Sequence, residues 1–154
     1  MTVESGKDYA LAPKVSWLFE TGVGKAFGLV TKEKFFLFPY ETIGGAGSKV
    51  TTTKFSVGGQ FPLDAVTELL ADPTTTVDSL HTTIEKWVSD VGPGPEIHLM
   101  SDFKRIKLRN GFFNRNVAFS VKESGFLGGV IAMRPKKAEM PAFYSLLEGD
   151  PRLI

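Results

Sequence analysis

The spacing of hydrophobic and polar residues divides the chain into three parts. Up to residue 61, short β-branched and aromatic runs alternate with polar or glycine-rich turns, a pattern typical of antiparallel strands. The expected strands cover residues 15–19, 27–31, 35–38 and 49–57. Residues 1–12 show no such pattern, and we expect them to be loosely ordered.

The second part, at about 62–91, has the apolar spacing of two helices. Pro62 suits a first helical turn, and Pro73 stops the first run. Residues 74–76 are threonines that can cap the second helix, which the sequence Gly92-Pro93-Gly94-Pro95 ends. The apolar stripe of the second helix is Val77, Leu80, Ile84, Trp87, Val88 and Val91. The spacing predicts a helical hairpin.

Strand patterns return in the third part. They cover residues 96–100, 103–109, 112–122 and 126–133, and a short closing helix is expected to begin near Pro141. The whole chain, 1–154, is of single-domain size. We therefore predict one α+β domain: a strongly bent antiparallel sheet or partial barrel of about seven strands, a two-helix hairpin between its halves, and a short C-terminal helix.

A basic hairpin stands out within this third part. Asn110-Gly111 lies between two period-2 segments, which predicts a two-residue type I′ turn with positive φ at both positions. The alternation places three cations of the first strand on one face, and two phenylalanines lie beside the turn. The candidate binding residues are Arg105, Lys107, Arg109, Phe112, Phe113 and Arg115.

The charges are sorted along the chain although the net charge is only +1. Residues 62–100 hold one lysine against seven acidic residues, whereas residues 101–154 hold ten basic and five acidic residues. This sorting predicts a dipolar surface. Two interpretations stay open: the basic hairpin faces solvent as a binding surface, or the acidic helices cover it.

No catalytic, cofactor or metal signature accompanies the hairpin. The chain has no cysteine, and the glycines near positions 24 and 45 match neither the P-loop nor the dinucleotide fingerprint. His81 and Glu85 share one helical face, but no third metal ligand is suggested nearby, so we interpret His81 as part of a solvated helix surface. The sequence thus favours a non-catalytic protein over an enzyme, with no cofactor and no metal.

The N-terminus lacks the basic and apolar regions of a signal peptide. No apolar run approaches the roughly 18 residues that a membrane span requires. We therefore expect a soluble, cytoplasmic protein.

Two segments carry a resemblance to a known superfamily. Gly28 to Phe38 resembles the β-hairpin of pleckstrin-homology and GRAM-like (PH-like) domains, and Ile97 to Ile106 is similar to the segment that follows it there. The resemblance implies a bent sheet closed by a C-terminal helix, and binding of a phospholipid headgroup or a protein. Relative to that pattern, residues 62–91 are an insertion. The inositide signature is not matched, because Lys25 is followed by Ala26-Phe27-Gly28-Leu29.

The favoured hypothesis is an interaction module whose basic hairpin binds an anionic partner, either an acidic protein surface or a phospholipid headgroup. Nucleic acid is a less favoured partner. A second hypothesis is a small-ligand carrier or enzyme with an apolar cavity between sheet and helices. A third is an immunity-type or structural partner of another protein, using the acidic helical face of Asp78, Glu85 and Asp90.

Overall fold

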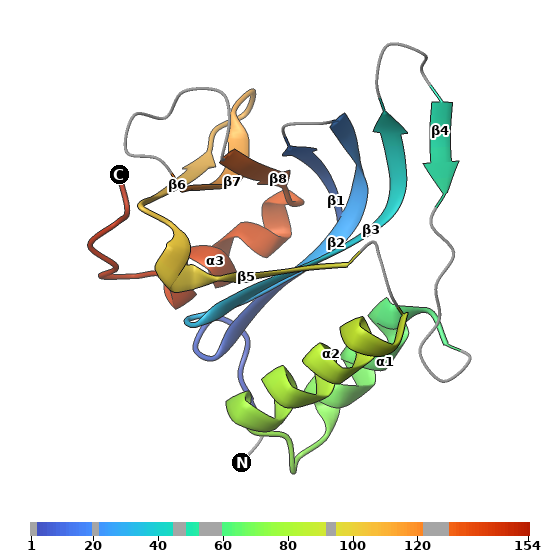
Figure 1. Cartoon of the computed structure of the whole chain (residues 1–154). Helices are drawn as coiled ribbons and strands as arrows, with labels where there is room; N and C mark the ends of the chain where they lie inside the picture. The colour runs from blue at the N-terminus through green and yellow to red at the C-terminus, as the bar shows by residue number, and fades with distance from the viewer. Residues whose placement is uncertain (1–2, 20–21, 45–48, 53–59, 92–94, 122–129) are drawn as a thin grey trace.

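The computed structural model describes residues 3–19, 22–44, 49–52, 60–91, 95–121 and 130–154. It confirms an α+β fold with a strongly bent antiparallel sheet, a helical hairpin and a short C-terminal helix (Figure 1). The strands are β1 (Tyr9–Phe19), β2 (Gly22–Thr31), β3 (Lys34–Gly44), β4 (Lys49–Thr52), β5 (Glu96–Leu99), β6 (Arg105–Asn110), β7 (Arg115–Ser120) and β8 (Val130–Arg134). The helices are α1 (Pro62–Ala71), α2 (Val77–Val91) and α3 (Met140–Leu146), with short 3-10 turns at Met100–Asp102 and Lys137–Glu139.

β1 joins the two halves of the sheet. The strand order is β4-β3-β2-β1-β8-β7-β6, and β5 also pairs with β3. β1 pairs with β2 along most of its length, whereas β8 pairs only with its end, Ser16–Leu18. Within the described residues the two outer edges do not meet, so the sheet is bent but does not close into a barrel.

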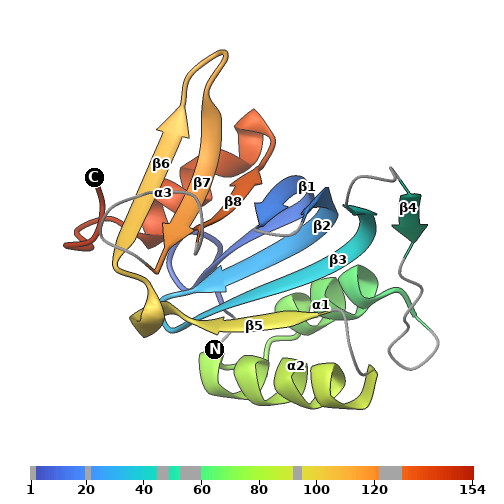
Figure 2. The ribbon, with the colours of Figure 1, turned by 45° about the horizontal axis from the view of Figure 1, so that its top comes forward.

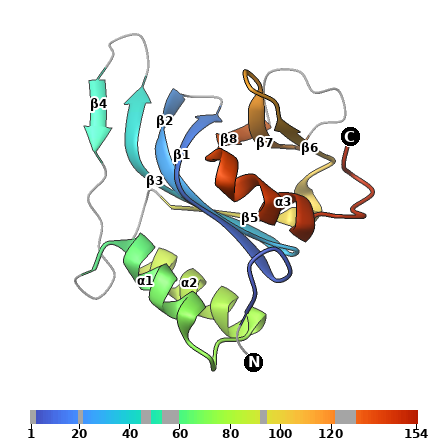
Figure 3. The ribbon, with the colours of Figure 1, turned by 180° about the vertical axis from the view of Figure 1, so that it is seen from behind.

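The two faces of β1–β3 are covered by different helices. α1 and α2 pack on one face, and α3 lies inside the bend on the other (Figures 1 and 3). We call the core under α1 and α2 the helix-side cluster, which consists of Val3, Phe27, Leu29, Phe36, Phe38, Val66, Leu70, Leu80 and Ile84. The inner cluster at α3 includes Val15, Val30, Phe35, Leu37, Met100, Phe103, Ile106, Val117, Phe119, Met133, Met140, Phe143, Leu146 and Leu147.

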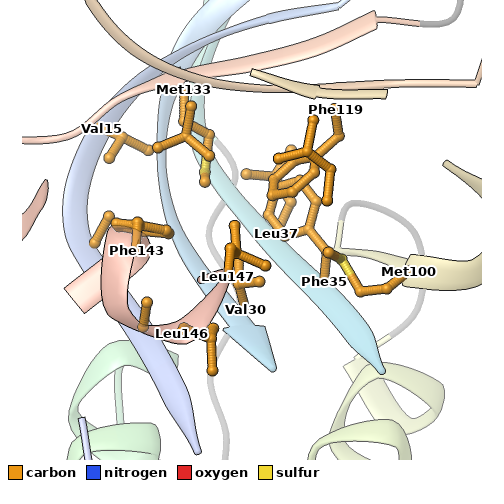
Figure 4. Close-up of a cluster of buried hydrophobic side chains, with 14 of the residues drawn as sticks. Val15, Val30, Phe35, Leu37, Met100, Phe119, Met133, Phe143, Leu146 and Leu147 are labelled. Carbon is orange, nitrogen blue, oxygen red and sulfur yellow. The ribbon is translucent and has the colours of Figure 1, made fainter. Parts of the chain in front are cut away.

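Aromatic rings connect the two half-sheets inside the bend. Phe119 of β7 lies with its ring centroid 5.0 Å from Phe35 of β3 and 5.0 Å from Phe103. All three rings are buried. Figure 4 shows Phe35 and Phe119 side by side, with Met100 beside them. Aromatic pairs at this spacing stabilise a structure beyond the burial of their apolar area. The three rings therefore hold β7 against β3.

Both helices of the hairpin have the bounds that the apolar spacing predicts. Pro62 is the first residue of α1 and Val77 the first of α2. At the start of α2 the Ser79 N–H donates to Thr76 Oγ1 (3.1 Å), and the Thr76 N–H donates to Ser79 Oγ (2.8 Å). These two bonds satisfy backbone donors that the helix leaves unpaired. Of the helices in the described part of the chain, none is long and apolar enough to cross a membrane.

The N-terminal segment differs from the expectation of loose order at residues 1–12. β1 begins at Tyr9, earlier than the strand expected at 15–19, and Val3 is buried in the helix-side cluster. The sequence did not predict the burial of Val3, because this single apolar residue is followed by the non-hydrophobic residues 4–8 and forms no periodic pattern. Parts of the strands expected at 49–57 and 126–133, namely 53–57 and 126–129, lie outside the described residues.

The expected two-residue turn at Asn110-Gly111 is wrong. Asn110 pairs with Arg115, so residues 111–114 form a four-residue loop, and Gly111 has no positive φ. A two-residue turn would have placed Arg115 opposite Ile106. The observed register instead places Phe119 opposite Ile106 and Val117 opposite Leu108. Burial of these cross-strand apolar pairs outweighs the local turn preference.

The C-terminal residues add to the edge of β6. The Ile106 N–H donates to the Arg152 carbonyl oxygen (3.0 Å), and the Ile154 N–H donates to the Ile106 carbonyl oxygen (3.1 Å). The Arg152 guanidinium is held by Asp150 (Nη2 to Oδ2, 2.8 Å) and donates to the Met100 carbonyl oxygen. The tail therefore pairs with β6 next to the 3-10 turn.

We expect Gly28→Ala to lower the free energy of unfolding, because an added Cβ would lie 2.5 Å from Met133 Sδ. The expected loss is about 1–3 kcal/mol, measured by urea denaturation. Combining Gly28→Ala with Met133→Ala makes room for the new methyl group, so the double variant should lose less than the sum of the two single losses.

Gly111→Ala is the matched control, because its Cβ would meet no heavy atom closer than 3.6 Å. Its free energy of unfolding should stay within about 0.5 kcal/mol of wild type. A large decrease in the free energy of unfolding of Gly111→Ala would contradict the four-residue loop and would favour a turn in which Gly111 has a positive φ.

Candidate functional site

The β6–β7 hairpin separates an apolar face from a basic face, as the alternation predicts. Ile106 and Leu108 face the inner cluster together with Val117 and Phe119 of β7. The neighbouring positions of β6 point to the opposite face. Their cross-strand pairs are Arg105 with Ser120, Lys107 with Ala118, and Arg109 with Asn116.

Two phenylalanines form the tip of this hairpin. Phe112 is 86% exposed and Phe113 is 87% exposed, well above the other exposed large apolar side chains of the described residues. Their rings contact each other edge to face, with centroids 4.7 Å apart and planes at 87°. The rings therefore offer a compact apolar tip that nothing in the described part of the chain buries.

Cations surround the base of the tip. Lys107 and Arg109 are partly exposed, and Arg115 follows the loop directly. Arg115 Nε donates to the Pro135 carbonyl oxygen (2.7 Å), which anchors that side chain against the segment before α3. Arg105 is partly buried at the other end of β6. Lys107 and Arg109 thus lie on the basic face near Phe112 and Phe113, Arg115 flanks the loop on the opposite face, and Arg105 lies farther from the tip.

The acidic helices do not cover the hairpin. α1 and α2 pack on β2 and β3 through the helix-side cluster. Figure 2 shows the β6–β7 hairpin projecting at the opposite end of the molecule from α2. Of the two interpretations of the sorted charges, the arrangement agrees with a basic surface separated from an acidic one. The resulting dipole runs from the helical layer toward the hairpin tip.

His81 forms a second polar feature, and the expectation of a solvated helix surface is wrong for this residue. The residue is 4% exposed, and its Nε2 lies 2.7 Å from Oγ1 of the buried Thr31. Helical spacing contained a signal for this, because position 81 lies beside Val77 and Val88 at the edge of the apolar stripe. The partner Thr31 is 50 residues away, so no local pattern could have found the pair.

Charges near His81 come from the β2–β3 turn and from α2. Glu33 Oε2 lies 3.7 Å from His81 Nδ1, and Lys34 forms an ion pair with Glu85. Burial lowers the pKa of His81, and the Lys34 charge lowers it further against the opposing effect of the nearby carboxylates. The imidazole is therefore neutral at neutral pH.

His98 lies on β5, where its Nε2 is 3.2 Å from Glu96 Oε1. This contact satisfies one nitrogen of the ring. Its ring also packs 5.8 Å from Phe35 and 5.9 Å from Phe103. His98 therefore belongs to the aromatic contacts beside the bend.

Comparison with protein-family models, with curated proteins and with solved structures gives no significant match for this chain. The PH-like resemblance accordingly stays a prediction.

We expect Thr31→Val to destabilise the protein. It leaves His81 Nε2 without its partner and removes the acceptor of the Lys34 backbone N–H (3.0 Å). A buried polar group left unsatisfied costs about 1–3 kcal/mol, which urea denaturation would measure. Thr31→Ser keeps the hydroxyl and should lose clearly less. If Thr31→Val lost no more than Thr31→Ser, the hydrogen bonds of the hydroxyl would not be what stabilises this position.

Proposed function

We propose that this protein is a non-catalytic binding module that docks on an anionic phospholipid membrane through the β6–β7 hairpin. The observation that carries the proposal is the tip itself, where Phe112 and Phe113 are almost fully exposed. Residues 103–121 contain five basic residues and no acidic one. Exposed aromatic rings next to cations suit the headgroup boundary, which is apolar below and negatively charged above.

The convex shape of the tip favours a membrane over an acidic protein surface. A protein partner would need a preformed pocket for two rings that stand at 87° to each other. A fluid lipid interface adapts to the rings without such a pocket. Both partners carry negative charge, and binding to vesicles of defined lipid composition distinguishes the membrane from an acidic protein.

The expected affinity is modest. Full burial of a phenylalanine side chain stabilises by about 1.5–3 kcal/mol, and headgroup-level insertion realises only part of that. Each basic residue near an anionic leaflet adds about 1 kcal/mol. Two rings with Lys107, Arg109 and Arg115 therefore support reversible attachment that depends on both the apolar and the charged groups.

The two other hypotheses find less support among the described residues. The pocket at the start of α2 has charged lining groups, including Lys7, Lys32 and Asp78, whereas a carrier of apolar ligands needs an apolar cavity. The acidic helical face partly engages its own chain, because Glu85 pairs with Lys34 and Asp78 lies beside Glu33 and His81.

The double variant Phe112→Ser/Phe113→Ser tests the apolar contribution. Because both rings are exposed, the variant should unfold at the same temperature as wild type. Its binding to phosphatidylserine-containing vesicles should weaken by about tenfold or more, measured by co-sedimentation. Tyr144→Ser removes an exposed aromatic ring from α3 and should bind like wild type. Unchanged binding of the double variant would contradict insertion of the tip.

Arg109→Glu tests the electrostatic contribution. It should weaken vesicle binding more than Lys86→Glu, which changes the net charge equally on the exposed side of α2. Raising the salt concentration from about 0.1 M to about 1 M shortens the screening length from about 10 Å to about 3 Å, and should release wild type from the vesicles. Vesicles of phosphatidylcholine alone should bind weakly. If wild type ignores phosphatidylserine vesicles at low salt, the membrane proposal fails and an acidic protein becomes the favoured partner.

A further inference from the structure

Three potential metal ligands meet between the β2–β3 turn and the start of α2. Glu33 comes from the turn, and Asp78 and His81 come from one face of α2, three residues apart. Their ligand atoms all lie within 4.8 Å of one another. The closest measured pair is Glu33 Oε2 and His81 Nδ1, at 3.7 Å. The group therefore combines one imidazole nitrogen with two carboxylates.

The His81 ring is fixed in an orientation that presents Nδ1 to these carboxylates. Its side chain is only 6% exposed, Nε2 is held by Thr31 Oγ1 at 2.7 Å, and one face packs 5.8 Å from the Phe36 ring. Within the described residues, Nδ1 itself has no hydrogen bond. Metal-binding histidines commonly have the second nitrogen held in this way by another group of the protein.

A pocket open to the surface leads to the two carboxylates. It has a volume of about 360 Å³, and Glu33 and Asp78 are part of its wall. The pocket gives a cation a path to the ligands and leaves room for coordinated water. Lys7 and Lys32 also line it. The positive charges of these two lysines repel an incoming metal ion. We therefore expect a dissociation constant on the order of micromolar, weaker than that of a closed structural site.

We propose that Glu33, Asp78 and His81 form a binding site for a divalent cation, with Zn²⁺ as the best match. Zinc accepts one imidazole and two carboxylates as three protein ligands, and water takes the fourth position. In a tetrahedral site the ligand atoms are about 3.3–3.5 Å apart. Glu33 Oε2 and Asp78 therefore have to approach Nδ1, which their exposed side chains permit.

The hydrogen bonds of Thr31 give this site a specific signature. Without metal, Oγ1 accepts the backbone N–H groups of Glu33 (3.3 Å) and Lys34 (3.0 Å), so its own proton is available for His81 Nε2. Nδ1 then carries the imidazole proton. A metal on Nδ1 requires the other tautomer, in which Nε2–H donates to Thr31 Oγ1 in place of one of the two backbone N–H groups and the hydroxyl turns to the Lys34 carbonyl oxygen (3.4 Å). Zinc binding should therefore move the proton of the neutral ring from Nδ1 to Nε2.

The test is calorimetric titration of the tag-free chain with zinc chloride at neutral pH, combined with long-range ¹H–¹⁵N spectra of the two histidines. We expect one zinc ion per chain and an exchange of the ¹⁵N shifts of the two His81 ring nitrogens. Glu33→Gln and Asp78→Asn should each weaken binding by about tenfold or more. Both positions are exposed, so the variants should keep the wild-type circular dichroism spectrum.

Asp90→Asn and His98→Gln are the matched controls. Asp90→Asn removes an exposed carboxylate from the same helix, and His98→Gln removes the only other histidine. Both should bind zinc like wild type. The proposal is overturned if no heat of binding is seen up to about 1 mM zinc. It is also overturned if only the His98 resonances change, or if Glu33→Gln and Asp78→Asn bind zinc as tightly as wild type.

Discussion

Packing of Phe119 inside the bend determines much of what the molecule presents to solvent. The ring touches Phe35 from the first half of the sheet and Phe103 from the start of the second. β1 supplies the backbone connection between the halves, and in the described part of the chain it pairs with β8 at three positions. The buried rings therefore help to fix the orientation of the β6–β7 hairpin. They also belong to the apolar cluster against which α3 packs.

The exposed tip follows from this burial. Because Phe119 has to lie opposite Ile106, the hairpin register leaves four residues to turn the chain, and the two phenylalanines fall among them. Local turn preference alone favours a tighter connection at Asn110-Gly111. Period and spacing predicted the two helices, the alternation of the basic strand and the bent sheet. The register escaped prediction because it depends on a ring partner more than 80 positions away in the sequence, Phe35.

The groups around His81 show a second limit of sequence reasoning. A helical wheel places His81 at the edge of the buried stripe, but its partners Thr31 and Glu33 lie at the end of β2 and in the turn that follows it. The residue types at positions 31 and 33 did not indicate a contact with His81, because threonine and glutamate are common in such turns. Alternation within one strand, by contrast, predicts from the sequence alone that Arg105, Lys107 and Arg109 share a face, and the register of β6 agrees with this. The sequence did not determine whether Phe112 and Phe113 are exposed, and only the tertiary structure shows that they are.

The tail that pairs with β6 has a consequence for how the protein behaves in concentrated solution. An edge strand with open backbone groups is a template on which another chain can add a strand, which leads to aggregation. Residues Arg152–Ile154 occupy the Ile106 portion of this edge, and the Arg152 side chain ties them to the 3-10 turn. Farther along β6, the edge carries Lys107 and Arg109, whose charges repel a second copy of the same strand. The basic hairpin thereby also protects the sheet against self-association.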